Sequence, residues 1–256
     1  MPEGDTVWQA AKRLRRLDDQ ILVHTDFRLP SLATTDLAGS RVLTTRSRGK
    51  HLLTRLDSGL SLHSHLKMEG SWAVHDRGAR WRKPAHTARV VLQTESLEAV
   101  GSQIVLDLLP SDREDEYVGR LGPDLLGDDW DPDEAVRRLA AQPAVPLADA
   151  LLDQRNLAGI GNVYKCELCF LTGVDPHRPV GEVSDLQRLV SLARRVLLAN
   201  RDRVDRVTTG RTRRGERTWV YGRRGPCLRC GTPIEYDELG PPGAERGTWW
   251  CPRCQR

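Results

Sequence analysis

The sequence predicts an α+β protein whose first half is mostly antiparallel β and whose second half is helical. Alternating apolar and polar residues run through 41–109, and apolar residues at helical spacing run through 147–200. A stretch rich in turn residues and charge separates the two patterns. The 256 residues, 39% hydrophobic and 29% charged, suffice for two domains with their own cores.

The chain lacks the sequence features of a membrane or secreted protein. No segment approaches the roughly 20 consecutive apolar residues of a membrane span, and the N-terminus lacks the apolar core of a signal peptide. We therefore expect a cytoplasmic protein that does not contact a membrane.

The first half begins with a predicted amphipathic helix from Asp5, its expected N-cap, to Leu17. Strands are expected in 41–109, and "DSG" at 57–59 forms a turn. In the strand that begins at Leu60, alternation places the leucines on the core face. The opposite face then carries Ser61, His63, His65 and Lys67, and Met68 falls at the start of a turn.

Charge marks the boundary between the halves and a basic region after it. From 112 to 134 there are ten acidic residues and two arginines, a net charge of −8. From 201 to 230 there are ten arginines and three acidic residues, a net charge of +7. Such a density of arginine suits a polyanion, although an ordinary solvated surface is an equal alternative on charge alone.

The second half contains four helical patterns. One begins near Pro132, and the others cover 147–155, 162–171 and 186–200, the last with Ser184 as its expected N-cap. Gly159 and Gly161 form a tight turn before the helix at Asn162. Glycines there allow the backbone to approach a phosphate near free helical N–H groups, or they simply connect two helices.

The C-terminus carries a predicted metal site. Two C-x2-C pairs lie 20 residues apart, and four thiolates form the tetrahedral set that Zn²⁺ prefers. Two disulfides are the alternative, which a reducing cytosol disfavours. A closed four-ligand set leaves no position for a substrate, so the metal is expected to be structural and to hold a hairpin. The ligands are Cys227, Cys230, Cys251 and Cys254. Cys166 and Cys169 lie within a predicted helix and are expected to be buried apolar residues.

Six segments together resemble one family. They are "MPEGDTVWQAAKRL", "SRGKHLLTRL", "HSHLKMEGSW", "LLDQRNLAGIGNVYKCELCF", "VYGRRGPCLRCGTPI" and "WWCPRCQR". Their order and content resemble the formamidopyrimidine-DNA glycosylase and endonuclease VIII family of bacterial base-excision repair, and most closely its endonuclease VIII branch.

The resemblance implies a domain organisation and a set of partners. It implies an N-terminal catalytic β-sandwich flanked by helices (1–110), an acidic linker with a connecting helix (111–146), a helix-two-turns-helix DNA-binding domain (147–220) and a zinc-finger hairpin (221–256). The implied activity is a bifunctional DNA glycosylase and apurinic/apyrimidinic (AP) lyase. The implied ligands are damaged DNA and one structural Zn²⁺, with no small-molecule cofactor, in a monomer associated with the bacterial nucleoid.

The same resemblance implies roles for individual residues. Pro2, once Met1 is removed, matches the nucleophile that forms a Schiff base, Glu3 matches the catalytic acid, and Lys50 matches the lysine that contacts phosphate and donates a proton. The secondary amine of Pro2 suits this role, because an α-amino group with a pKa near 8 is substantially neutral in the cell. The positive end of the following helix is expected to lower that pKa further.

The resemblance also implies DNA contacts. A base must leave the duplex before its sugar is attacked, and Met68 matches the apolar wedge that fills the gap. The other residues that match DNA-binding positions are His65, Lys67, Glu69, Asn162 and Arg246.

Differences from the family pattern indicate which class of damaged base the protein prefers. "PEGD" resembles the endonuclease VIII opening, and the segment 207–219 is short for a loop that caps 8-oxoguanine, so oxidised pyrimidines are favoured. "HLKMEG" is closer to the formamidopyrimidine branch and keeps oxidised purines as the alternative. A damaged-DNA binding protein without catalysis would have no need to keep Pro2, Glu3 and Lys50. A zinc-ribbon protein that acts on RNA or transcription would not require a free N-terminal proline.

Overall fold

The computed structural model describes residues 2–256, which form two compact units, the first ending at Arg120 and the second beginning at Leu121. Each unit has its own hydrophobic core. The division falls inside the segment 111–146. Along the described chain, none of the helices combines the length and the apolar composition that spanning a membrane requires.

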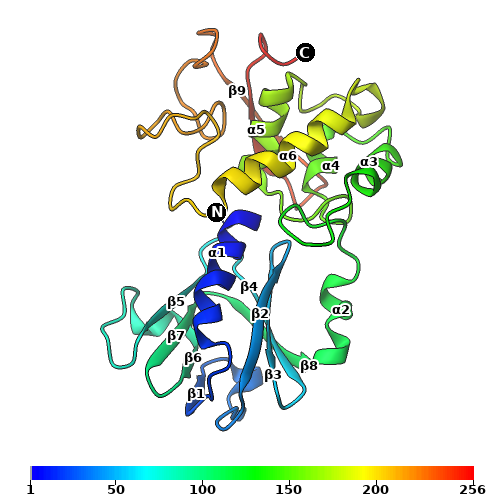
Figure 1. Ribbon diagram of the computed structural model, residues 1–256. Helices are drawn as coiled ribbons and strands as arrows, with labels where there is room; N and C mark the ends of the chain where they lie inside the picture. The colour runs from blue at the N-terminus through cyan, green and yellow to red at the C-terminus, as the bar shows by residue number, and fades with distance from the viewer. Residues whose placement is uncertain (1) are drawn as a thin grey trace. The chain divides into compact units, whose positions relative to one another are not determined.

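The first unit is a β-sandwich of two four-stranded antiparallel sheets (Figure 1). One sheet has the order β1-β6-β7-β5, and its strands are β1 (His24–Phe27), β5 (Ser71–Asp76), β6 (Ala88–Gln93) and β7 (Leu97–Ser102). The other has the order β2-β3-β4-β8, and its strands are β2 (Val42–Arg48), β3 (His51–Leu56), β4 (Leu60–His65) and β8 (Val105–Pro110).

One core joins the two sheets. Apolar side chains of the second sheet, such as Leu52, Leu62 and Leu106, share a buried cluster with Trp72 and Leu92 of the first. Each sheet thus buries one apolar face against the other, which is how a sandwich removes apolar surface from water. The predicted α+β class with an N-terminal antiparallel sandwich is confirmed.

A helix packs against this sandwich. Helix α1 (Gly4–Leu14), extended by the 3-10 turn η1 (Arg15–Leu17), contacts β2, β3 and β5. The prediction that Asp5 is the N-cap is wrong, because Glu3 holds that position. Asp5 lies in the first turn, where its carboxylate accepts a hydrogen bond from the Thr6 N–H at 2.7 Å. Acidic residues are favoured both as caps and in the first turn, so the sequence did not distinguish the two positions.

Strand β4 is buried on both faces, which simple alternation does not predict. Leu62 and Leu66 lie in the core as expected, but Ser61 and His63 on the opposite face are also buried. The 3-10 turn η4 (Ser111–Arg113), Glu114 and the short helix α2 (Asp115–Val118) cover that face.

Glu114 fastens this cover to the sheet. Its buried carboxylate accepts hydrogen bonds from Ser61 at 2.6 Å, from Arg46 at 2.6 Å and from Arg55 at 2.7 and 2.9 Å. Burial opposes ionisation of this group, but the bonds from Arg55, Ser61 and Arg46 outweigh it and lower the pKa of Glu114 to about 2.

The second unit is helical. Its helices α3 (Pro132–Ala140), α4 (Leu147–Leu152), α5 (Asn162–Thr172) and α6 (Leu186–Asn200) surround one core (Figure 1). Asp131 caps α3 by accepting hydrogen bonds from the next helical N–H groups, and Pro132 is the first helical residue. The cap of α6 is Asp185, which accepts from the Arg188 N–H at 2.7 Å, so the prediction of Ser184 is wrong by one residue.

The chain ends in a hairpin between the two cysteine pairs, as predicted. Strands β9 (Glu235–Leu239) and β10 (Arg246–Trp250) pair antiparallel, with Arg246 opposite Leu239 and Trp250 opposite Glu235. Strand β10 packs against α5. The remaining 3-10 turns are η2 (Pro30–Leu32), η3 (Ala85–Thr87) and η5 (Val180–Glu182).

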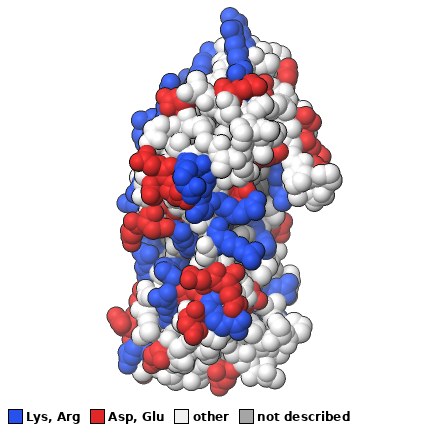
Figure 2. Space-filling view, turned by 90° about the vertical axis from the view of Figure 1, so that its right-hand side faces the viewer, with Lys and Arg blue, Asp and Glu red and all other residues white. Residues whose placement is uncertain are grey.

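Acidic and basic side chains are grouped side by side on the face drawn in Figure 2. Ion pairs also form within the acidic segment 112–134 and with its neighbours, since Glu134 pairs with Arg137 and Arg138 at 2.6 Å, and Glu116 pairs with Arg113. Part of the negative charge counted in the sequence is therefore balanced locally.

Candidate active site and metal centre

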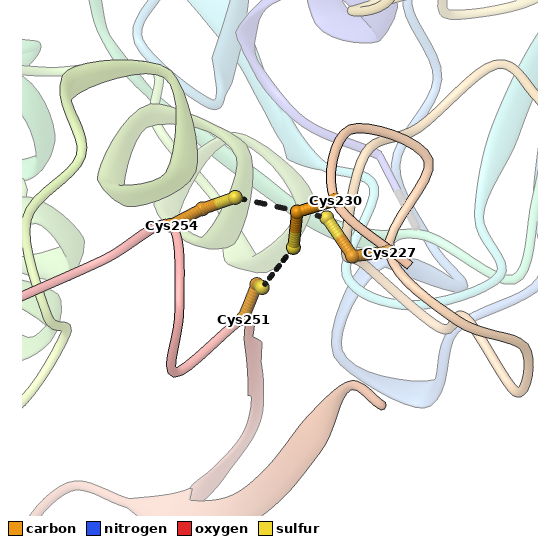
Figure 3. Close-up of side chains that lie close together, drawn as sticks. All are labelled: Cys227, Cys230, Cys251 and Cys254. Carbon is orange, nitrogen blue, oxygen red and sulfur yellow. Dashed lines mark hydrogen bonds between the residues drawn. The ribbon is translucent and has the colours of Figure 1, made fainter. Parts of the chain in front are cut away.

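The four C-terminal cysteines converge on one point (Figure 3). All four Sγ atoms lie within 4.8 Å of one another, with Cys227 and Cys254 at 4.0 Å and Cys230 and Cys251 at 3.5 Å. A tetrahedral zinc ion with bonds of about 2.3 Å requires sulfurs about 3.8 Å apart, so the donor set fits one Zn²⁺. A bound ion would join the turn before β9 to the turn after β10 and hold the hairpin.

Two side chains at the start of α5 bind the hairpin backbone. The buried Lys165 donates from Nζ to Thr248 Oγ1 at 2.6 Å and to the Gly247 carbonyl at 3.4 Å. Asn162 donates from Nδ2 to the same carbonyl at 2.8 Å. The hairpin strand β10 is thereby fixed to the first turn of α5.

The predicted DNA contacts of this unit differ in exposure. Asn162 is only 4% exposed, and within residues 2–256 its buried Oδ1 has no hydrogen-bond partner. Arg246 lies at the exposed start of β10, where its guanidinium donates to the Glu245 carbonyl at 2.9 Å. Cys166 and Cys169 are fully buried, as predicted, and burial raises the pKa of the Cys169 thiol.

A buried glutamate organises the arginine-rich segment. Glu167 accepts hydrogen bonds from the consecutive N–H groups of Trp219, Val220 and Tyr221 at 2.7 to 2.9 Å, and from the Thr208 hydroxyl. Burial raises the pKa of Glu167, while these bonds oppose the rise. Both ends of the segment 208–219 are therefore held at α5. Sequence patterns did not identify Glu167, because it looks like an ordinary helical residue.

Pro2 and Glu3 lie at the beginning of α1. Pro2 is partly buried, whereas Glu3 is fully buried and its carbonyl accepts from the Val7 N–H at 3.0 Å. Lys50 lies in the tight turn between β2 and β3, two of the three strands that α1 contacts. Gly49 in that turn has a φ of +56°, a conformation that favours glycine.

The turn after β4 projects Met68 into solvent. Lys67 is left-handed with a φ of +50°, its N–H donates to His65 Nδ1 at 2.9 Å, and Met68 is 60% exposed. A Cβ at Gly70 would lie 2.4 Å from the Leu66 carbonyl, so only glycine fits there.

Two side chains from neighbouring loops brace this turn. Lys83 donates to the Glu69 carbonyl at 2.9 Å, and Gln103 donates to the Glu69 carboxylate at 3.1 Å. Lys83 also donates to Gln103 Oε1 at 3.3 Å. The backbone that carries Met68 is therefore held while its side chain stays open to solvent.

A group of histidines lies beside this turn, and the sequence reading did not identify it as a unit. His51 Nδ1 and His63 Nε2 are 2.8 Å apart, and His63 Nδ1 lies 3.4 Å from Asp107 Oδ2. Burial lowers the pKa of His51 to about 3 and of His65 to about 4, and nearby positive charge contributes. The "DSG" turn in the sequence could have revealed this group, because it fixes the register that places His51 opposite His65.

Comparison with known proteins covers nearly the whole chain. Residues 1–104 match the formamidopyrimidine-DNA glycosylase N-terminal domain, 121–202 match the H2TH domain of the same glycosylase, and 225–256 match the zinc finger found in FPG and IleRS. The chain is also 56% identical to a probable endonuclease 8 2 of Streptomyces coelicolor, over all of this chain and 94% of that protein.

The chain belongs to the formamidopyrimidine-DNA glycosylase and endonuclease VIII family. This is a family of DNA glycosylases and AP lyases of base-excision repair, as the resemblance implied. A DNA-(apurinic or apyrimidinic site) lyase of Mycolicibacterium smegmatis is 50% identical over all of this chain and 99% of that protein. The family's zinc finger coincides with the four clustered cysteines, and one structural zinc is the cofactor.

Solved structures confirm the fold of this family member. A Lactococcus lactis Fpg bound to DNA with an abasic site has a TM-score of 0.83, with 22% identity over 99% of both chains. The antiparallel sandwich, the helical unit and the C-terminal hairpin are thus the family architecture.

Proposed function

We propose that this chain is a bifunctional DNA glycosylase and AP lyase that excises oxidised bases, with oxidised pyrimidines preferred. The observation that carries the proposal is the Pro2–Glu3 pair at the start of α1, on a sandwich that matches the family's catalytic N-terminal domain. The proposal is supported by relatives named endonuclease 8, among them one of Klebsiella pneumoniae at 33% identity.

Pro2 acts as the nucleophile after Met1 is removed. Its neutral secondary amine attacks C1′ of the damaged nucleotide, and the C1′–N bond to the base breaks as the base takes up a proton. The attached amine then loses its proton, the C1′–O4′ bond of the sugar breaks with protonation of O4′, and the opened sugar is left as an iminium ion. The iminium acidifies the C2′ proton, whose loss expels the 3′ phosphate by β-elimination, and δ-elimination then expels the 5′ phosphate. The location of Pro2 beside the N-terminus of α1 supports this role, because the helix dipole disfavours the protonated amine.

Glu3 and Lys50 transfer protons in this scheme. Glu3 follows the nucleophile directly and is shielded from water, which favours directed proton transfer over exchange with solvent. Lys50 is presented by a tight turn between strands that contact α1, and its ammonium contacts phosphate and donates a proton to the leaving group.

DNA is held by residues of both units. Met68 fills the space that the flipped nucleotide leaves, with His65, Lys67 and Glu69 beside it. In the second unit Asn162 and Arg246 contact the phosphate backbone. The zinc hairpin acts indirectly, because it positions Arg246 and closes over the start of α5. A monomer in the cytoplasm suffices for this activity.

The lesion preference is tested with duplexes that each contain one modified base. We expect faster excision of dihydrouracil and thymine glycol than of 8-oxoguanine at equal enzyme concentration, because the short segment 208–219 is fastened at both ends and offers little length to cap a purine. Faster excision of 8-oxoguanine would support the alternative, which the sequence "HLKMEG" favours. No excision combined with tight binding would instead indicate a damage-binding protein.

A further inference from the structure

The first unit contains a chain of three hydrogen-bonding groups that the scheme above does not use. Asp107 on β8, His63 on β4 and His51 on β3 lie in sequence across three neighbouring strands. His63 is 3% exposed, and its ring packs on Tyr117 at 4.4 Å between centroids. The Asp107 side chain is 43% exposed at one end of the chain.

The protons of the two imidazoles have one consistent arrangement. The Asp107 carboxylate requires a donor, so His63 carries its proton on Nδ1 and presents Nε2 as an acceptor. His51 must then carry its proton on Nδ1 to satisfy the 2.8 Å contact with His63. The Nε2 of His51 is left unprotonated, and within the described residues it has no hydrogen-bond partner.

We propose that the chain Asp107–His63–His51 is a proton-uptake site, at which His51 Nε2 gains a proton when a DNA phosphate binds beside it. The inference rests on the proposed function, since it takes DNA as the ligand. The added proton forms an N–H bond that donates to the phosphate, and the Asp107 carboxylate balances the new charge through two hydrogen bonds.

The surroundings favour uptake at His51 over its neighbours. His65 is directly opposite His51 in the strand register, but its Nδ1 already accepts from the Lys67 N–H at 2.9 Å. His63 is occupied at both ring nitrogens. The other charged or titratable groups that face the chain are Lys50, Lys67, Glu114 and Tyr117.

His51 stays neutral when no ligand is bound, and a nearby anion raises its pKa. Burial, followed by electrostatic interactions with His63, His65, Lys67 and Lys50, holds the pKa of His51 at about 3 in the absence of a ligand. An opposite charge within hydrogen-bonding distance raises such a pKa by about 1 to 3 units. Binding of a phosphate therefore brings the pKa of His51 to about 4 to 6, so that the group takes up a fraction of a proton at pH 6.

The test measures proton uptake when the protein binds a duplex that carries a tetrahydrofuran abasic analogue, which the enzyme cannot cleave. Calorimetry at pH 6 in two buffers with different ionisation enthalpies gives the number of protons bound. We expect measurable uptake, up to about half a proton, by the wild type and by the control His86→Gln, whose imidazole is exposed in η3. His51→Gln should abolish this uptake, and Asp107→Asn should reduce it and weaken binding at pH 6 more than at pH 8.

The outcomes separate the inference from the proposed function. Equal proton uptake by His51→Gln and wild type overturns the proton-uptake site, as does normal binding by the wild type without uptake. In both cases the proposed function stands. Absence of any binding to the abasic duplex overturns both. Circular dichroism of the two variants, which replace partly exposed side chains with near-isosteres, checks that they fold.

Discussion

At the scale of single residues, the buried Glu3 is the group whose chemical role can be isolated most cleanly. It is fully buried and directly follows the proposed nucleophile. In the proposed mechanism it is required as an acid when the base leaves but not when an abasic site is already present. Glu3→Gln should therefore lower excision of dihydrouracil by about 10²- to 10⁴-fold, the usual contribution of a general acid or base. Cleavage of preformed abasic DNA should fall much less.

Single-turnover gel assays on the two substrates measure this difference. The isosteric amide keeps the volume of the side chain, so folding is checked by an unchanged melting temperature. An equal loss on both substrates would assign Glu3 to both steps and contradict an acid role confined to departure of the base.

Met68 allows a second test at this scale. Its side chain is 60% exposed on a turn held by Lys83 and Gln103, so truncation should not alter the fold. Met68→Ala should reduce excision from duplex DNA on the order of 10-fold, because an empty gap restores the stacked base, and should change excision from single-stranded DNA little. Val204→Ala is the matched control, since Val204 is 96% exposed in the other unit.

At the scale of elements, sequence patterns located the long periodic segments better than the short ones. Helices α5 and α6, strands β2 to β4 and the cysteine hairpin lie where apolar spacing and turn residues place them. Strand β1 was not singled out because it has only four residues, and β5 and β7 were not singled out because segments such as "LEAVGS" alternate weakly.

The parts of the site that depend on tertiary contacts escaped prediction for a physical reason. Glu114 belongs to a run of acidic residues that reads as a solvated segment, yet it is 2% exposed because Arg46 and Arg55 from neighbouring strands neutralise it. Glu167 is similar, since its partners are backbone groups more than 50 residues away in the chain. Local periodicity contains no information on such distant partners.

The lowered pKa of Glu114 leads to a prediction of how the stability of the sandwich depends on pH. Its pKa is lowered from about 4.5 to about 2, so the stabilisation is fully present above pH 4.5 and disappears as the pH falls toward 2. Glu114→Gln should therefore destabilise the protein by about 2 kcal/mol at pH 7. This is less than the roughly 3 to 5 kcal/mol for breaking a fully buried ion pair, because the arginine partners are partly exposed and screened by water. The difference from the wild type should shrink at acid pH.

Thermal denaturation between pH 7 and pH 3 measures this difference. Glu116→Gln is the control, since Glu116 pairs with Arg113 at a surface position where both side chains are more than half exposed. A difference between Glu114→Gln and the wild type that stays constant down to pH 3 would contradict the assignment.

At the scale of the whole molecule, the second unit depends on zinc for its folded hairpin, whereas the first unit does not. The four cysteines and the hairpin belong to the second unit, and the sandwich has a separate core in the first. Removing zinc with a chelator should therefore abolish DNA binding, because the contacts of β10 with Asn162 and Lys165 depend on the hairpin. The sandwich should stay folded.

Fluorescence anisotropy with a labelled abasic duplex and circular dichroism measure these two effects. Cys169→Ala is the control for the loss of a thiol outside the metal site, and it should keep its affinity. Full retention of affinity after chelation would contradict the role of the hairpin.

The identity of the covalent bond to DNA tests the central claim most directly. The processed protein is incubated with uracil-derived abasic DNA and borohydride, and the adduct is digested and located by mass spectrometry, which also reports whether Met1 has been removed. We predict one adduct on the N-terminal peptide at Pro2, and none when Met1 is retained. Absence of an adduct from the processed protein, or an adduct on a lysine such as Lys50, would contradict the account.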